Sequence, residues 1–95
     1  MLVKKLQNEQ IKALKSGDKA RLEILRYILA QIHNKEIEKK GNLSDEEVVS
    51  VLKKITKELK ESIASSQKGQ RMDLVNSYQQ QLKIVNEFLP AYEAT

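Results

Sequence analysis

Hydrophobic residues recur along this chain every three or four positions, the spacing that places them on one side of an α-helix. At about 100° per residue, three segments carry a continuous apolar stripe: residues 18–40, 44–68 and 71–89. The stripe residues are Leu22, Ile24, Leu25, Ile28, Leu29 and Ile32 in the first segment, Val48, Val51, Leu52, Ile55, Leu59 and Ile63 in the second, and Leu74, Val75, Tyr78, Leu82, Val85 and Leu89 in the third, where Ile84 and Phe88 widen it. These segments are predicted to be helices with one buried side.

A weaker apolar stripe occupies residues 2–16. Val3, Leu6, Ala13 and Leu14 align on one side of a helix, but Gln10 interrupts them. Three complete stripes and one partial stripe predict four helices that bury their apolar sides against one another.

The ends of the first two segments carry residues that stop and start helices. Gly17 is predicted to take the left-handed position that ends the first helix, and Asp18 to cap the second. Gly41 is expected to close the second helix, after Lys39 and Lys40 in its last turn.

The third helix has the clearest start. Ser44 followed three residues later by Glu47 predicts a capping box, and Leu43 and Val48 are spaced for a hydrophobic staple. Pro90 is predicted to end the fourth helix at Leu89, since proline disfavours helical geometry in the preceding residue.

Short connections between the segments favour antiparallel neighbours. The predicted fold class is all-α, a four-helix antiparallel bundle-like domain over residues 1–89, followed by a tail at 90–95. A chain of 95 residues has room for one such domain.

Composition supports helices and narrows the cellular setting. The chain is 40% hydrophobic and 32% charged, with 3 Gly and 1 Pro, which favours helices over a sheet. It has no cysteine, so disulfides, thiolate metal sites and a cysteine nucleophile are excluded. No apolar run reaches the roughly 18 residues that cross a bilayer, and the N-terminus lacks the apolar region of a signal peptide. We expect a cytoplasmic protein with no membrane partner.

Positive charge is concentrated in the first half of the chain. Residues 1–41 carry ten Lys and Arg against five Asp and Glu, a net charge of +5, whereas residues 42–95 carry seven against eight, a net charge of −1. This asymmetry favours an anionic partner.

Four basic positions repeat every seven residues along the second segment: Lys19, Arg26, His33 and Lys40. Seven residues advance a helix by about 10.5 Å, so the row is about 31 Å long, the scale of a phosphate backbone. We name these four the α-row and take them, with Lys53, Lys57 and Lys60 on the outer side of the third segment, as the candidate nucleic-acid-binding residues. Arg21, Lys35 and Lys39 are expected to emerge at the ends of the bundle.

The basic positions also have a plainer interpretation. In a chain this rich in charge, Lys and Arg often cover the edges of a core with their stems while their charges stay in water. Protein–protein interaction is a further alternative, based on the interrupted stripe of residues 2–16 and on the additional apolar edge formed by Ile84 and Phe88.

Catalytic groups are scarce. His33 is the single histidine, and among its helical neighbours only Glu36 could serve as a second ligand, so no metal site is predicted. The acidic group Asp45, Glu46 and Glu47 is explained by helix capping. No glycine-rich phosphate loop and no serine with a neighbouring base is evident, so neither a cofactor nor a catalytic residue is predicted.

The order of these motifs resembles the YqeY proteins of the GatB/YqeY family. The resemblance rests on Asp18-Lys19-x-Arg21-Leu22-x-x-Leu25-Arg26, Asn34-x-Glu36-Ile37, the capped start at residues 43–47, Glu61-Ser62-Ile63 and Phe88-Leu89-Pro90. It implies an all-helical fold and kinship with the tail of the B subunit of a tRNA-dependent amidotransferase, which is thought to contact tRNA. It also implies the carbon–nitrogen ligase activity, with glutamine as amide donor, under which the family is catalogued.

Family members typically continue beyond the Phe-Leu-Pro motif into a second, smaller helical domain. Here that domain is expected to be missing, since only "AYEAT" follows Pro90. The resemblance therefore favours a tRNA-binding or RNA-binding accessory module, with a protein-interaction module as the alternative and amide transfer third.

Overall fold

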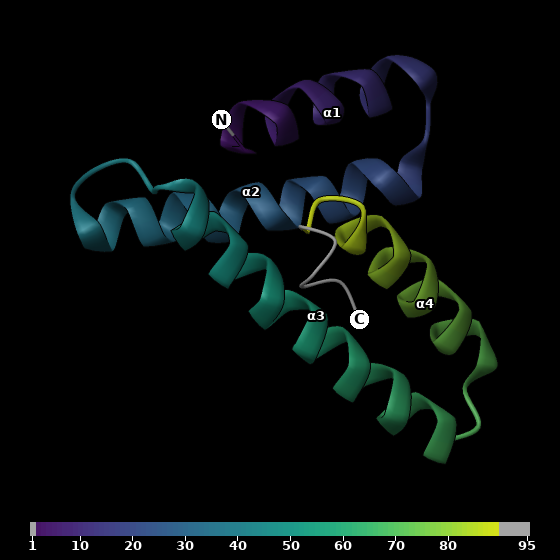
Figure 1. Ribbon diagram of the computed structural model, residues 1–95. Coiled ribbons are helices and arrows are strands. Elements are labelled where there is room, and N and C mark those ends of the chain that lie inside the picture. Colours follow the sequence, from purple (N-terminus) through teal and green to yellow (C-terminus); the bar gives the residue numbers. More distant parts are fainter. Residues whose placement is uncertain (1, 90–95) are drawn as a thin grey trace.

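Residues 2–89 are described by a computed structural model, and over this range the chain forms four helices and no strand. The helices are α1 (Leu2–Ser16), α2 (Lys19–Lys39), α3 (Asp45–Lys68) and α4 (Met72–Asn86) (Figure 1). The predicted all-α class and the four helical segments are confirmed. No helix within residues 2–89 combines the length and apolar character needed to cross a lipid bilayer.

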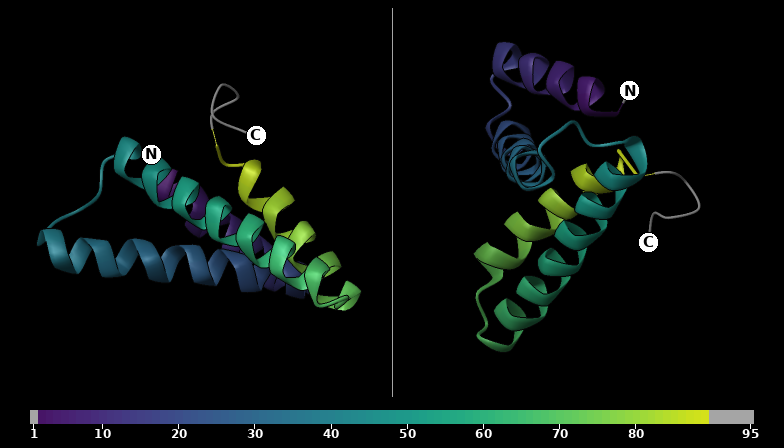
Figure 2. Two further views of the ribbon diagram at one scale, coloured as in Figure 1. Left: turned by 90° about the horizontal axis from the view of Figure 1, so that it is seen from below. Right: turned by 90° about the vertical axis from the view of Figure 1, so that its left-hand side faces the viewer.

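Two helical hairpins build the molecule. α1 and α2 lie antiparallel and form the first hairpin, and α3 and α4 do the same in the second (Figure 1). The second hairpin crosses α2 obliquely, so that the start of α3 and the end of α4 lie against the first hairpin while the α3–α4 turn extends away from it (Figures 1 and 2). The bundle is therefore two crossed pairs rather than four parallel rods.

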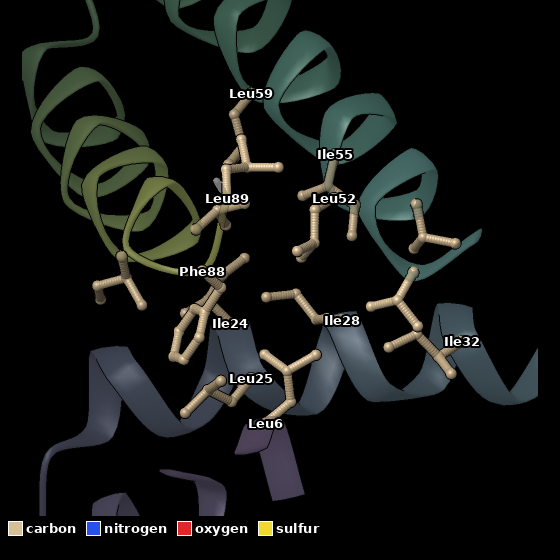
Figure 3. Close-up of a cluster of buried hydrophobic side chains, with 14 of the residues drawn as sticks. Leu6, Ile24, Leu25, Ile28, Ile32, Leu52, Ile55, Leu59, Phe88 and Leu89 are labelled. Atoms are coloured by element: carbon tan, nitrogen blue, oxygen red, sulfur yellow. The ribbon is translucent and has the colours of Figure 1, made fainter. Parts of the chain in front are cut away.

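The core fills the crossing of the two hairpins. Side chains from all four helices and from the turn after α4 point into one interior there (Figure 3). Its buried members include Leu6, Ile24, Leu25, Ile28, Ile32, Leu52, Ile55, Leu59, Val85, Phe88 and Leu89. The predicted stripes are thus confirmed over the crossing.

Away from the crossing the stripes are less buried than predicted. Ile63, Leu74, Tyr78 and Leu82 are only half-buried, because the outer half of the second hairpin has no third helix against it. Leu14, predicted to face the core, is 60% exposed on α1.

Ile84 and Phe88 behave in the opposite way. Both were predicted as an additional apolar edge available to a partner, but they are only 7% and 6% exposed. Their place in the buried stripe is confirmed, but the prediction of a free edge was wrong, because both side chains belong to the core cluster, where Phe88 points into the interior (Figure 3).

The helix starts follow the sequence prediction closely. Asp18 Oδ1 accepts a hydrogen bond from the Arg21 amide at 3.1 Å. Ser44 and Glu47 form the complete capping box, with Ser44 Oγ accepting from the Glu47 amide at 3.2 Å and Glu47 Oε1 accepting from the Ser44 amide at 2.9 Å. Leu43, the proposed staple residue, is buried in the core.

The helix ends differ in two places. Gly17 takes the predicted left-handed conformation, with φ of 74°, but at the end of α2 it is Lys40 (φ 62°) rather than Gly41 that does so. α4 ends at Asn86 rather than at Leu89, because the chain turns there to bring its last apolar side chains into the core. Pro90, the predicted helix terminator, lies outside the described residues.

Candidate nucleic-acid interface

The α-row residues Lys19, Arg26, His33 and Lys40 are all exposed along the outer side of α2. Lys19 is the first residue of α2, and Lys40 is its left-handed C-cap, so the row spans the whole helix. Lys19, Arg26 and Lys40 form no ion pair with any of residues 2–89. Their charges are thus available to an external anion.

Carboxylates of the first hairpin are largely engaged elsewhere. Glu9 pairs with Lys12 at 3.2 Å and with Arg21 at 3.0 Å. Glu36 Oε2 accepts a hydrogen bond from the Leu43 amide at 3.4 Å, and Glu38 pairs with Lys35 at 3.5 Å. Asp18 caps α2, so these four acids serve the fold, and the remaining carboxylate of the first hairpin is Glu23, one turn from Lys19 and Arg26.

The α3 lysines form a separate surface. Lys53, Lys57 and Lys60 are exposed on the side of α3 opposite its buried residues. Because α2 and α3 meet through their buried sides, these lysines and the α-row point away from the common interface and do not line one cleft. Lys53 and Lys60 also have interaction partners within the protein.

Arg21 has a different role from the one expected. Instead of emerging from the bundle, its guanidinium lies between two helices and the turn after α4. Nη1 and Nη2 donate to the two Glu87 carboxylate oxygens at 3.1 and 3.0 Å, and Nη2 also donates to Glu9 Oε1 at 3.0 Å. The guanidinium carbon lies 5.8 Å from the centre of the Phe88 ring, over which Lys5 also sits at 5.9 Å. We call Arg21, Glu9, Glu87 and Phe88 the arginine clasp.

Electrostatics within the clasp are mutually reinforcing. The pKa of Glu9 lies below its ordinary value, mainly because the carboxylate accepts a hydrogen bond from Arg21. The pKa of Arg21 is raised, chiefly by its hydrogen bonds to Glu87 and despite partial burial. Both pKa shifts favour the charged forms of Glu9 and Arg21, and the hydrogen bonds to Glu87 hold the turn after α4 against the first hairpin.

Lys39 is also engaged rather than free. Its Nζ donates to Glu47 Oε1 at 2.6 Å and to the Asn42 carbonyl at 3.0 Å. Hydrogen bonds from Lys39 and from the Ser44 amide lower the pKa of Glu47 to about 2. Glu47 thus caps α3 and fastens the end of α2 to it.

Two clefts open between α2 and α3. The larger, of about 700 Å³, also reaches α4 and is lined by Glu23, Ile24, Tyr27, Ile55, Glu58, Leu59, Glu61, Ser62, Ser65, Ser66, Tyr78 and Gln81. We call it the acidic cleft. The smaller, of about 510 Å³, has an apolar floor that includes Leu43 and Val51, with Lys35, Lys39 and Lys54 among its lining residues. Ile55 and Glu58 line both clefts. None of the seven candidate nucleic-acid-binding residues lines either.

His33 is exposed, and residues 2–89 contain no group of three His, Cys, Asp or Glu side chains that could hold a metal ion. The clasp and the acidic cleft were not identified from the sequence. Along the chain, Arg21 is 12 residues from Glu9 and 66 residues from Glu87, so only the tertiary arrangement brings the three together.

Comparison with known proteins gives a family for the chain. The family described as Yqey-like protein matches residues 3–93, nearly the whole sequence and all four helices. A search of curated proteins finds no match. The match and the helical fold agree with the resemblance seen in the ordered motifs from Asp18 to Pro90. The chain therefore belongs to the family of YqeY-like proteins.

Proposed function

We propose that this protein is an RNA-binding accessory module that holds tRNA, or RNA of similar shape, through the outer side of its first hairpin. The observation that carries the proposal is the α-row, in which Lys19, Arg26 and Lys40 are exposed and have no ion-pair partner among residues 2–89. The row lies on the hairpin that holds the excess positive charge of the chain.

The mode of binding follows from the groups available. Charges about 10.5 Å apart along a helix can neutralise phosphates spaced along one strand without touching base edges. Tyr27 is the one aromatic side chain of α2, and its hydroxyl is already hydrogen-bonded to Glu58 at 3.3 Å. Contact is therefore expected with the backbone and shape of the RNA, with little preference for sequence.

A salt titration tests this proposal. Affinity for tRNA, measured by fluorescence anisotropy, should fall as salt rises, with a log–log slope of about −2 to −4 if three or four phosphates are contacted. Arg26→Glu should weaken binding about tenfold or more at low salt. The matched control is Lys83→Glu, which makes the same charge change on the exposed side of α4. Equal effects of both variants, or no binding at low salt, would overturn the proposal.

A protein-interaction module is the second candidate, and a specific observation on α1 favours it. Ile11 and Leu14 lie one turn apart and are 50% and 60% exposed. Exposed apolar pairs of this kind can seat against a partner helix. If this surface, rather than the α-row, serves the protein, then Leu14→Glu should abolish partner or self-association in sedimentation experiments while leaving tRNA affinity unchanged.

A further inference from the structure

The acidic cleft lies where α2 meets the second hairpin, and its charge is opposite to that of the whole protein. Glu23 from α2 and Glu58 and Glu61 from α3 line it, whereas no Lys or Arg does. Glu23 and Glu61 form no ion pair with any of residues 2–89. In a chain with a net charge of +4, this is a local concentration of negative charge.

The floor and walls of the cleft are built for apolar contact. Ile24, Ile55 and Leu59 belong to the core and present their outer edges here. Tyr27 and Tyr78 come from α2 and α4 and lie among the lining residues, so aromatic rings come from two of the three helices around the opening. The cleft therefore offers an apolar base beneath a polar, acidic rim.

Tyr27 fixes part of this rim. Its hydroxyl donates to Glu58 Oε1 at 3.3 Å, and the residue is 43% exposed. The pKa of Tyr27 is raised, first by partial burial and then by the neighbouring Glu58 charge, so the phenol stays protonated as a donor. This hydrogen bond connects α2 to α3 at the point where the acidic cleft adjoins the smaller one.

We propose that the acidic cleft docks a basic amphipathic helix of another protein. Apolar side chains of that helix would rest on the floor, and its Lys or Arg side chains would pair with Glu23, Glu58 and Glu61. Two features select this occupant. The charge of the rim is complementary to a basic segment and repels a phosphate backbone, and a groove between helices suits an amphipathic helix with anchors at i, i+3 or i+4.

This docking site is distinct from the proposed RNA surface. None of the α-row residues lines the cleft, and the α-row meets it only at Glu23, which lies on α2 one turn from Lys19 and Arg26. A single domain could thus hold RNA on one side and a basic protein on the other, and loss of one interaction should leave the other in place.

The test uses the full chain and a fluorescein-labelled 15-residue amphipathic helical peptide of Lys, Leu and Ala. Two further peptides accompany it: one with every Lys replaced by Glu, and one with the same composition scrambled so that no apolar side forms. Binding of the amphipathic basic peptide is expected in the micromolar range at low salt, with at least tenfold weaker binding of each of the other two.

Variants then locate the binding. Glu23→Gln combined with Glu61→Gln should weaken the peptide at least tenfold, and Ser65→Arg, which places a cation in the exposed rim, should do the same. Glu46→Gln is the matched control, because Glu46 is an exposed acid of α3 outside the cleft. Circular dichroism melts confirm that each variant is folded.

Four outcomes would overturn the inference: equal binding of the scrambled peptide, equal effects of Glu46→Gln and the cleft variants, no peptide binding at low salt, or a dimer of this chain that the cleft variants dissociate. Excess tRNA should leave peptide affinity unchanged within twofold, and strong competition would likewise contradict separate surfaces. The RNA proposal is judged separately, by the effect of Arg26→Glu on tRNA alone.

Discussion

Arg21→Met is the most informative single change in this structure. Methionine keeps an apolar stem of similar length against Phe88 but removes the guanidinium, and with it the hydrogen bonds to Glu9 and Glu87. The clasp joins α1, α2 and the turn after α4, so its removal should loosen that turn from the first hairpin.

The expected loss in the free energy of unfolding can be estimated from the exposure of each interaction partner of Arg21. The side chains of Arg21 and Glu9 are 22% and 21% exposed, so their pair belongs at the upper end of the range for surface salt bridges, about 1 kcal/mol. Glu87 is 48% exposed, and its pair is discounted to about 0.5 kcal/mol for solvent screening. The ring of Phe88 adds about 0.5 kcal/mol. The free energy of unfolding should fall by about 2 kcal/mol, or about 8–16 °C in Tm for a domain of this size.

Urea denaturation and calorimetry measure this loss, and double-mutant cycles divide it. Coupling between Arg21→Met and Glu9→Gln should exceed that between Arg21→Met and Glu87→Gln, since the first pair is less exposed. Arg71→Met is the control, because its ion pair with Asp73 at 3.2 Å is 61% and 67% exposed and should leave Tm unchanged. A loss equal to that of the control, or no coupling with either glutamate, would refute the reasoning.

Two further predictions concern the α2–α3 connection and the core. Because the pKa of Glu47 is lowered to about 2 from 4.5, its stabilising contribution is complete above pH 4.5 and is lost as pH falls toward 2. In acid titrations followed by circular dichroism, Glu47→Gln should therefore flatten the dependence of stability on pH between pH 4.5 and 2. An unchanged pH dependence would contradict the assignment. Leu52→Ala leaves a cavity at a fully buried site of the crossing and should lower the free energy of unfolding, measured by urea denaturation, by about 2–5 kcal/mol. Leu14→Ala, at an exposed site, should change it by less than about 0.5 kcal/mol. Comparable losses for the two variants would mean that the crossing is not the core.

The sequence predicts well those features that depend on residues close together in the chain, namely the helix caps and the apolar stripes. The caps at Asp18 and Ser44 depend on side chains within three positions, and the apolar stripes depend on a fixed helical period, so both could be read before the structure was known. The change from Gly41 to Lys40 at the end of α2 is a shift of one residue.

What the sequence could not predict depends on how the hairpins cross. Leu14 and Phe88 are both apolar members of helical stripes, yet Leu14 is exposed on α1, beside the buried Ala13, whereas Phe88 is buried in the core at the crossing. Arg21 illustrates the same limit, since its partner Glu87 is 66 residues away. The acidic cleft likewise requires three helices to meet before its glutamates gather.

The crossing also determines which charges remain available. Arg21, Lys35 and Lys39 were indistinguishable from the α-row by charge alone, yet each has a carboxylate partner, at 3.0, 3.5 and 2.6 Å. Arg21 and Lys35 pair with carboxylates of their own hairpin, and Lys39 pairs with the carboxylate that caps α3. Lys19, Arg26 and Lys40 stay exposed on the outer side of α2, while Glu23 and Glu61, which form no ion pair with any of residues 2–89, line the cleft between α2 and the second hairpin. Folding thus leaves these cations outside the cleft and gathers Glu23, Glu58 and Glu61 around it, and for this reason the RNA and peptide affinities should respond to different substitutions.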